Sequence, residues 1–396
     1  MSNASPNKIL FYLIALLLAI LLIEIGLQGI NGVASLFTKK QEDTPLLLYY
    51  QDKKMAEQIW KETWDAIKDR DYTQFLGWAD RTYHGLYVNE DQQSGRKTWN
   101  PEVPPGQALP KIFFFGGSSG WGFGVRDNFT IPSYLSRRLN TPRSQFQVFN
   151  YSVPGYVFMQ GIINLTLMLK EGQSPQYVIF YDGFNEIYAA HQHGTAGTVH
   201  NLFMDRQRMK RESLRYRDLI WNGLRESVRK YSMIYKAIVS MVITIDKDKM
   251  FQEIAQNYND NQLRSLARDI VDDYKKSLNL VDHLSTTYNF KYICFWQPSM
   301  LTENKLFDKE ANIDPWLKNE VFKKLYAYTN EYLQKEKIPH FYILTDVLEK
   351  RTEPVYIDAA HISEKGNEIL SGVIYQYVQK EFYSTNAGNH GPKTSQ

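Results

Sequence analysis

The chain has 396 residues, of which 43% are hydrophobic, so it is long enough to bury a large core in one large domain or two ordinary ones. Its formal net charge of +3 is too small for a protein that binds a polyanion, and we therefore expect no nucleic-acid partner. The single cysteine, Cys294, excludes an internal disulfide framework and a thiolate metal cluster.

The first expected element is an apolar helix at the N-terminus. Residues 9–23 are uninterrupted apolar, and the stretch continues to Ile30 with only Glu24 and Gln28 as polar interruptions. Since about 20 helical residues span a bilayer core, residues 1–30 are predicted to form one transmembrane anchor. A cleaved signal peptide is the alternative, because small residues at 32–34 suit a signal peptidase. Either way, we expect the rest of the protein to lie outside the cytoplasm, with a second membrane protein as a candidate partner.

Residues 31–110 are predicted to be a linker and an N-terminal extension that packs on the domain after it. They mix short amphipathic runs with turn signals, such as NPEVPPGQALP at 100–110. The regular alternation of strand and helix patterns begins only at residue 111.

Five short apolar runs, rich in β-branched and aromatic residues, alternate with helical patterns from there on: KIFFF (111–115), FQVFN (146–150), YVIFYD (177–182), YICFW (292–296) and HFYIL (340–344). Runs that are apolar on both faces indicate parallel strands covered by helices on both sides. We therefore predict a doubly wound α/β domain over residues 111–383, with a five-stranded parallel sheet in the flavodoxin-like order 2-1-3-4-5. A helical insertion is expected at 187–275, with a basic run at 206–217, and a flexible tail at 384–396.

Polar groups and glycines follow the first three predicted strands. Ser118 lies in GGSSG, Gly155 in NYSVPGY and Asn185 in DGFNE. Ligands bind beyond the carboxyl ends of strands in such sheets, so these segments are expected to meet at one crevice. Together they offer a hydroxyl, a backbone donor and an amide donor.

A serine nucleophile needs a base, and the stretch YIDAAHISEKGN near the C-terminus supplies Asp358 and His361. A spacing of three residues lets the carboxylate hold Nδ1 of the imidazole while Nε2 faces the crevice. Ser119 is a rival nucleophile, and its alternative role is that of an ordinary loop hydroxyl.

Four segments, FFGGSSGWGFGV, NYSVPGY, YDGFNE and DAAHISEKGN, resemble in this order the signature segments of the SGNH/GDSL hydrolase superfamily. The resemblance covers about residues 110–380 without the insertion. It implies Ser118 as nucleophile, Asp358 and His361 as the rest of the triad, and an oxyanion hole formed by the Ser118 N–H, the Gly155 N–H and the Asn185 amide. An anchored domain with this form of the motif also resembles bacterial envelope proteins that add or remove acyl groups on polysaccharides.

The activity implied is acyl transfer through an acyl-serine, as an esterase or an O-acyltransferase acting on an O-acylated carbohydrate or another envelope component. The alternative is a catalytically inactive module of the same fold that binds carbohydrate or serves as a scaffold. Two residues depart from the family pattern: Gly117 stands where Asp is frequent, and Glu186 where Asp frequently follows the asparagine. We expect no cofactor and no metal, because His191 and His193 lack a clear carboxylate partner pattern.

Overall fold

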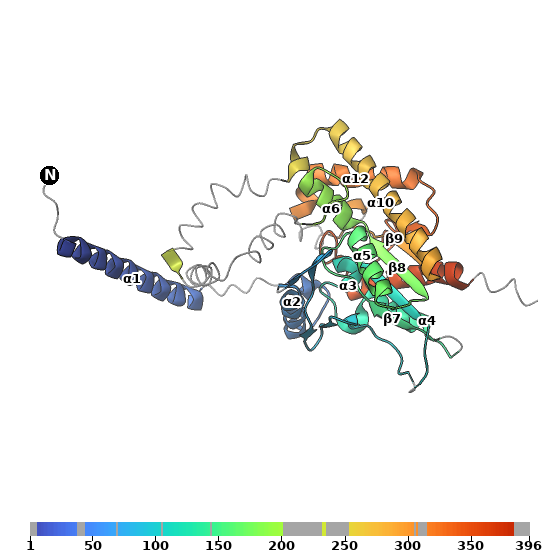
Figure 1. Cartoon of the computed structure of the whole chain (residues 1–396), viewed down its shortest axis with the longest axis horizontal. Coiled ribbons are helices and arrows are strands. Elements are labelled where there is room, and N and C mark those ends of the chain that lie inside the picture. The colour runs from blue at the N-terminus through green and yellow to red at the C-terminus, as the bar shows by residue number, and fades with distance from the viewer. Residues whose placement is uncertain are drawn as a thin grey trace, which may run out of the picture. The chain divides into compact units, whose positions relative to one another are not determined.

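The computed structural model describes residues 6–37, 44–68, 70–103, 106–142, 145–200, 232–234, 253–304, 306–307 and 315–383 (Figure 1). The chain divides into two units. The smaller unit combines Met1–Glu42 with Gln207–Gln252, and the larger combines Asp43–Arg206 with Glu253–Gln396. The two units are described separately.

In the smaller unit, helix α1 spans Pro6–Phe37, and large apolar side chains on it, such as Phe11 and Leu22, are exposed. The Glu24 carboxylate on this helix accepts hydrogen bonds from the Ser232 hydroxyl at 2.9 Å and the Ile234 N–H at 3.0 Å. Over the described parts of the chain, no helix meets the length and apolarity that a bilayer crossing requires, and the predicted transmembrane anchor is not found there. The basic run at 206–217 and the tail at 384–396 lie outside the described residues.

The larger unit is built on an eight-stranded sheet in the order β10-β9-β8-β6-β7-β5-β4-β3. Five of its strands are mutually parallel: β6 (Lys111–Gly116), β7 (Gln147–Asn150), β8 (Tyr177–Asp182), β9 (Lys291–Trp296) and β10 (Phe341–Ile343). They coincide with the five predicted runs. When these five strands are numbered 1 to 5 along the chain, they lie side by side in the sheet in the order 2-1-3-4-5.

Three further strands join this sheet in antiparallel pairing: β3 (Tyr83–His84), β4 (Asn89–Asp91) and β5 (Gly95–Arg96). They come from the segment expected to be linker and extension, so the prediction of a five-stranded, purely parallel sheet is wrong in strand number and in direction. Strands of two or three residues are too short to show a period of two along the sequence. A separate hairpin pairs β1 (Asp71–Thr73) with β2 (Gly77–Ala79).

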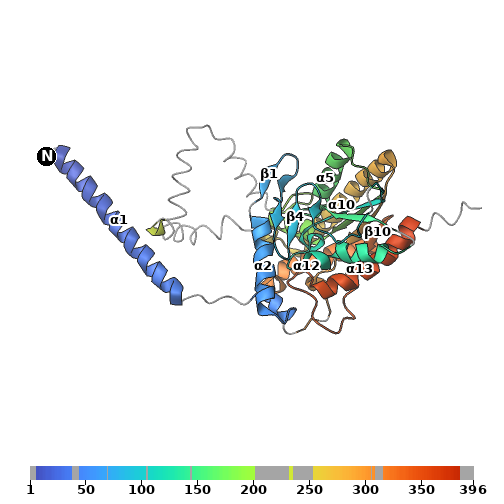
Figure 2. The same ribbon diagram turned by 90° about the horizontal axis from the view of Figure 1, so that it is seen from below.

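Side chains of the parallel strands alternate between two cores, as the pleat of a β-strand requires. On one face, Phe113 and Phe180 pack under α5 (Phe158–Lys170), α6 (Phe184–His193), α10 (Asp260–Tyr288) and α12 (Glu320–Lys335). On the other, Phe114 and Ile179 pack under α4 (Ile131–Leu139) and α13 (Glu364–Val378). Figures 1 and 2 show these two helical layers from two directions. Residues 187–193 and 260–275, assigned to an insertion from the sequence, therefore belong to helices that cover the sheet.

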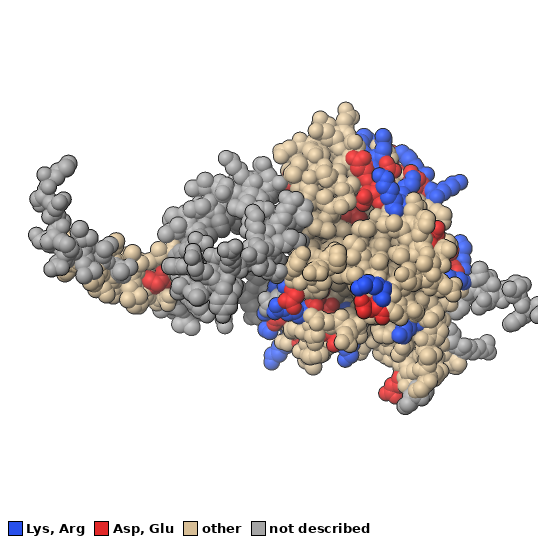
Figure 3. Space-filling view, viewed as in Figure 1, with Lys and Arg blue, Asp and Glu red and all other residues tan. Residues whose placement is uncertain are grey.

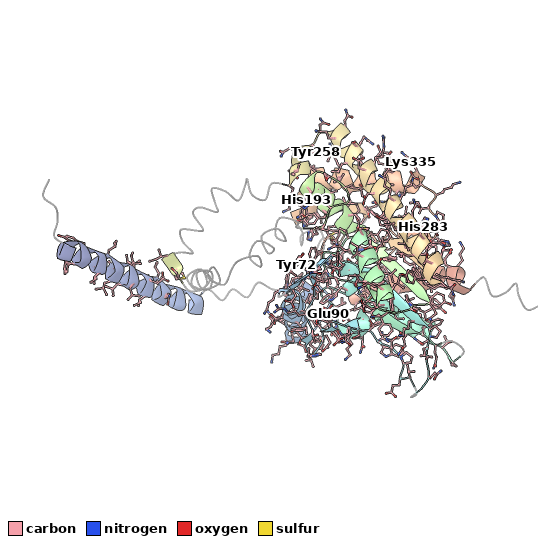
Figure 4. All side chains as sticks on the ribbon, viewed as in Figure 1. Tyr72, Glu90, His193, Tyr258, His283 and Lys335 are labelled. Carbon is pink, nitrogen blue, oxygen red and sulfur yellow. The ribbon has the colours of Figure 1, made fainter. Side chains whose placement is uncertain are left out.

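The N-terminal segment of this unit is fastened by buried carboxylates. Glu62, on helix α2 (Lys53–Lys68), accepts hydrogen bonds from the backbone N–H groups of Leu86, Tyr87 and Val88 at 2.8–3.0 Å. Burial opposes ionisation of Glu62, but these donors and a side-chain donor hold its pKa below the usual value. Glu90 of β4, labelled in Figure 4, accepts a hydrogen bond of 3.0 Å from the indole of Trp121.

Charged side chains of both signs are mixed over α10 and α12 on the face shown in Figure 3. Lys324 pairs with Asp260 at 2.8 Å, and Lys335 with Glu331 at 2.7 Å, all on exposed side chains. Exposed pairs of this kind contribute little to stability. The fold is therefore stabilised chiefly by the two apolar layers on the sheet.

Candidate active site

Ser118, His361 and Asp358 form a continuous hydrogen-bonded chain. The Ser118 hydroxyl lies 2.7 Å from Nε2 of His361, and Nδ1 of the same ring lies 2.6 Å from Oδ2 of Asp358. The serine and the histidine are 243 residues apart in the chain. Ser118 directly follows β6, and His361 lies in the connection from β10 to α13. The structure thus brings together the three residues that the sequence suggested as a triad.

The serine is presented by a turn that leads directly from a strand into a helix. Strand β6 ends at Gly116, and Ser118 is the first residue of the short helix α3 (Ser118–Trp121). Asn150, at the end of β7, donates from its side chain to the Gly120 carbonyl at 2.9 Å and so fixes this turn from the neighbouring strand. The hydroxyl is therefore held beyond the end of the sheet.

The surroundings of the Asp358 carboxyl group favour its ionised form. Its Oδ1 accepts the backbone N–H groups of Ala360 at 2.9 Å and of His361 at 2.8 Å, while Oδ2 faces the imidazole. Burial opposes ionisation, but the imidazole and the two N–H donors outweigh it and hold the pKa of Asp358 below its usual value. The ring of Phe123 stacks on His361, with centroids 4.2 Å apart, and adds a second constraint on the imidazole.

The three expected oxyanion donors also converge. Asn185, near the start of α6, donates one amide hydrogen to the Tyr156 carbonyl at 2.7 Å, which leaves its second hydrogen for a ligand. Gly155 and Asn185 line the same cavity as Ser118. A side chain at Gly117 would clash with the Asn185 amide, which explains locally why the residue before the nucleophile is glycine here.

Gly155 adopts a left-handed backbone conformation, with φ of 87°, that disfavours any residue with a side chain. A Cβ placed there would also lie only 3.2 Å from Nδ1 of His200. Both conditions favour glycine at the position where a backbone N–H is expected to face the substrate.

Glu186 connects the two segments that carry the oxyanion donors. One carboxylate oxygen accepts the N–H of Phe158 at 2.5 Å, three residues after Gly155, and the other accepts the N–H of Gly183 at 2.7 Å, two residues before Asn185. Burial, with the nearby Glu186 carboxylate, raises the pKa of Asp182. The departure from the family's aspartate at position 186 thus has a structural role.

Ser119, the rival nucleophile, is 6% exposed, and its hydroxyl donates to the Ala360 carbonyl at 2.8 Å. That bond ties the nucleophile turn to the loop between Asp358 and His361. The geometry therefore favours Ser118 as nucleophile and gives Ser119 a structural contact.

A cavity of about 410 Å³ opens over the triad. Its walls are largely aromatic, and the side chains of Arg70 and His200 line it near Gly155. The lining beyond the triad and the oxyanion donors comprises Trp60, Trp64, Ile67, Arg70, Phe123, Pro154, Phe184, Tyr188, His200, Trp316 and Ala360. Trp64 is 48% exposed and packs edge-on against Phe123 at 5.4 Å, so the wall next to His361 remains open to a ligand.

The aromatic wall and Arg70 were not identified from the sequence. Trp60 and Trp64 are four residues apart on an amphipathic helix, which places them on one face and is a signal that could have been used. Phe123 lies five residues after Ser118 in the same motif. Arg70, directly before the β1–β2 hairpin, carries no such signal.

The other residues weighed from the sequence are not among the described residues that line the cavity over the triad. His191 is fully buried on α6, with Nδ1 at 3.2 Å from a carboxylate oxygen of Glu253. His193 lies near the end of the same helix, where Figure 4 labels it beside Tyr258, whose hydroxyl donates to the Gly194 carbonyl at 3.1 Å. Cys294 is buried in β9.

No protein-family model matches the chain, and no curated protein sequence matches it. Solved structures do match. An acetyl xylan esterase, AlAXEase, covers 68% of this chain and 99% of its own, with 12% identity and a TM-score of 0.35. A lipolytic protein of the G-D-S-L family from Veillonella parvula covers 69% and 98%, with 11% identity and a TM-score of 0.31.

A third match, the acetylxylan esterase Axe2 from Geobacillus stearothermophilus, covers 68% of this chain and 94% of its own, with 12% identity and a TM-score of 0.33. The second of these three matches is named as a G-D-S-L family protein, and the four sequence motifs of this chain resemble the same superfamily.

Proposed function

We propose that this chain is a serine esterase that cleaves acyl esters through an acyl-serine intermediate. The observation that carries the proposal is the chain of short hydrogen bonds from the Ser118 hydroxyl through His361 to Asp358. In that arrangement the imidazole can accept the serine proton while the carboxylate stabilises the imidazolium that forms.

The reaction proceeds in two steps. Oγ of Ser118 attacks the ester carbonyl as its proton passes to Nε2 of His361, and the carbonyl oxygen becomes an oxyanion. The Ser118 and Gly155 N–H groups and the free hydrogen of the Asn185 amide bind that oxyanion. The imidazolium then protonates the leaving alcohol, and a water molecule, deprotonated in turn by His361, releases the acid from the serine.

We propose an O-acylated carbohydrate as the substrate, on the basis of the wall next to His361. The leaving alcohol must lie at Nε2 to receive its proton, and there it meets the rings of Phe123 and Trp64. The C–H faces of a sugar ring pack well on such aromatic surfaces. If a sugar hydroxyl replaces water at the acyl-serine, the same residues perform acyl transfer, and the ratio of acid to transferred product measures the partition between the two.

An envelope location outside the cytoplasm also remains part of this proposal. Cell fractionation combined with protease accessibility of the larger unit tests it. Recovery of the active enzyme in the cytoplasmic fraction would contradict it.

The decisive experiment combines turnover with labelling. The protein should hydrolyse 4-nitrophenyl acetate, and a fluorophosphonate should add a single label that maps to Ser118. Ser118→Ala should abolish both, whereas Ser94→Ala, at an exposed turn residue, should change neither. An unchanged rate in Ser118→Ala overturns the proposal, and glycan binding without turnover or label would favour the inactive binding module.

A further inference from the structure

We propose that Arg70 is a carboxylate-binding site beside the oxyanion hole, so that the substrate carries a carboxylate in addition to the ester that is cleaved. This inference rests on the proposed esterase function and narrows its substrate class to anionic esters.

Arg70 belongs to the catalytic cavity. It lines the same space as Ser118, and its Nη1 lies 3.9 Å from where a Cβ of Gly155 would be. The Arg70 side chain is only 15% exposed, whereas arginine side chains usually lie at the protein surface. A charged group held this far inside a cavity next to the reacting carbonyl is placed to meet the substrate.

Asp80 and Trp78 fix the orientation of the Arg70 guanidinium. Nε donates to Oδ1 of Asp80 at 2.7 Å, the Asp80 side chain is 2% exposed, and the guanidinium carbon lies 5.9 Å from the centre of the Trp78 ring. Nη1 and Nη2 of Arg70 make no hydrogen bond to any residue that the structure describes. The Nη edge therefore retains donors that can bind a planar carboxylate.

The charges around the cavity are consistent with an anionic ligand. Asp358 is the carboxylate among the described lining residues, and its oxygens are engaged by His361 and backbone N–H groups. Burial, together with Arg70 and another histidine, lowers the pKa of His200 to about 4, so this neighbour is neutral at pH 7. Arg70 is thus the permanent cation that the described lining offers to a substrate.

The carboxylate could lie on either side of the scissile ester, and two matched substrate pairs distinguish the sides. 4-Acetoxybenzoate against its methyl ester places the charge on the alcohol. Mono-4-nitrophenyl glutarate against 4-nitrophenyl pentanoate places it on the acyl group. The quantity measured is the ratio of kcat/KM for the charged ester to that for the neutral ester, which cancels any general loss of folded enzyme.

For at least one pair, Arg70→Gln should lower this ratio roughly ten- to hundredfold, the effect expected when a hydrogen bond to a charged group is lost. Arg70→Lys should restore part of it. Arg264→Gln, at an exposed arginine of α10 that pairs with Glu331, is the matched control and should leave both the ratio and the activity unchanged. Equal losses on charged and neutral esters in Arg70→Gln overturn the inference and make Arg70 a purely structural residue.

A binding measurement separates this inference from the proposed function. Tryptophan fluorescence of the full protein is titrated with 4-hydroxybenzoate and with its methyl ester, since Trp60, Trp64 and Trp316 line the cavity. Tighter binding of the carboxylate that is lost in Arg70→Gln supports the site even if no ester is hydrolysed. Absence of that preference overturns a site on the alcohol side, and equal losses on the glutarate pair in Arg70→Gln overturn one on the acyl side, even if 4-nitrophenyl acetate is a good substrate.

Discussion

The substitution Asp358→Asn tests the chemistry of the site with little change in its structure. In the native protein, Oδ1 accepts two backbone N–H groups and Oδ2 faces Nδ1 of His361. An asparagine can keep both backbone bonds only by turning its carbonyl oxygen toward them. Its NH₂ group must then occupy the place of Oδ2 and donate to Nδ1.

That donation reverses the tautomer of the imidazole. The ring proton moves to Nε2, which then points a hydrogen at the Ser118 hydroxyl 2.7 Å away instead of accepting its proton. By analogy with triads in which the same substitution has been made, kcat should fall by about 10⁴. The variant should remain folded, because both backbone bonds survive.

The assay is steady-state hydrolysis of 4-nitrophenyl acetate, with the thermal unfolding midpoint as the measure of folding. Asp358→Ala serves as comparison, because it removes the carboxylate without supplying a donor that imposes the wrong tautomer. A loss of less than about tenfold in the well-folded Asp358→Asn variant would refute the role assigned to this carboxylate.

Four further outcomes follow from the geometry. Asn185→Ala should lower kcat about 10²–10³-fold on a chromogenic ester, as expected for loss of one oxyanion donor, and a change below tenfold would remove it from that role. Glu186→Gln should lower kcat about tenfold or more with little change in KM, because it loosens both oxyanion segments without touching substrate; a selective rise in KM would contradict this. Trp64→Ala should raise KM severalfold for an acetylated sugar but not for 4-nitrophenyl acetate, and equal effects on the two would argue against a sugar-binding wall. Glu62→Gln should lower the free energy of unfolding by about 2–4 kcal/mol, measured with urea at pH 7. Because the folded-state pKa of Glu62 lies below its ordinary value of 4.5, its contribution is present above that pH and is lost as the pH falls through the folded-state pKa, so wild type and variant should converge in acid.

The parallel strands and the candidate triad could be predicted because their signals are local. A run such as KIFFF is apolar on both faces, Ser118 and Asn185 directly follow strands of the sheet, and His361 comes just before the last long helix. The common edge of parallel strands then brings those segments together in space. The choice between Ser118 and Ser119 as nucleophile, in contrast, needed the structure, because it depends on the hydrogen bond from the Ser119 hydroxyl to a distant carbonyl.

What escaped prediction depends on contacts between distant short segments. Strands β3, β4 and β5 have two or three residues each and acquire their identity only by pairing beside β7. Arg70 reaches the cavity because Asp80, ten residues later, returns across the β1–β2 hairpin to hold it. Neither arrangement leaves a periodic trace in the sequence.

The origin of the cavity wall has a consequence for how this protein could diversify. The groups assigned to bond-making come from loops after residue 110, whereas Trp60, Trp64 and Arg70 come from the segment before it. Part of the recognition surface is thus encoded in a stretch of polypeptide that is separate from the reactive groups. If the proposed esterase function holds, exchange of the early stretch alone should redirect the protein to a different ester while its reactive groups stay intact.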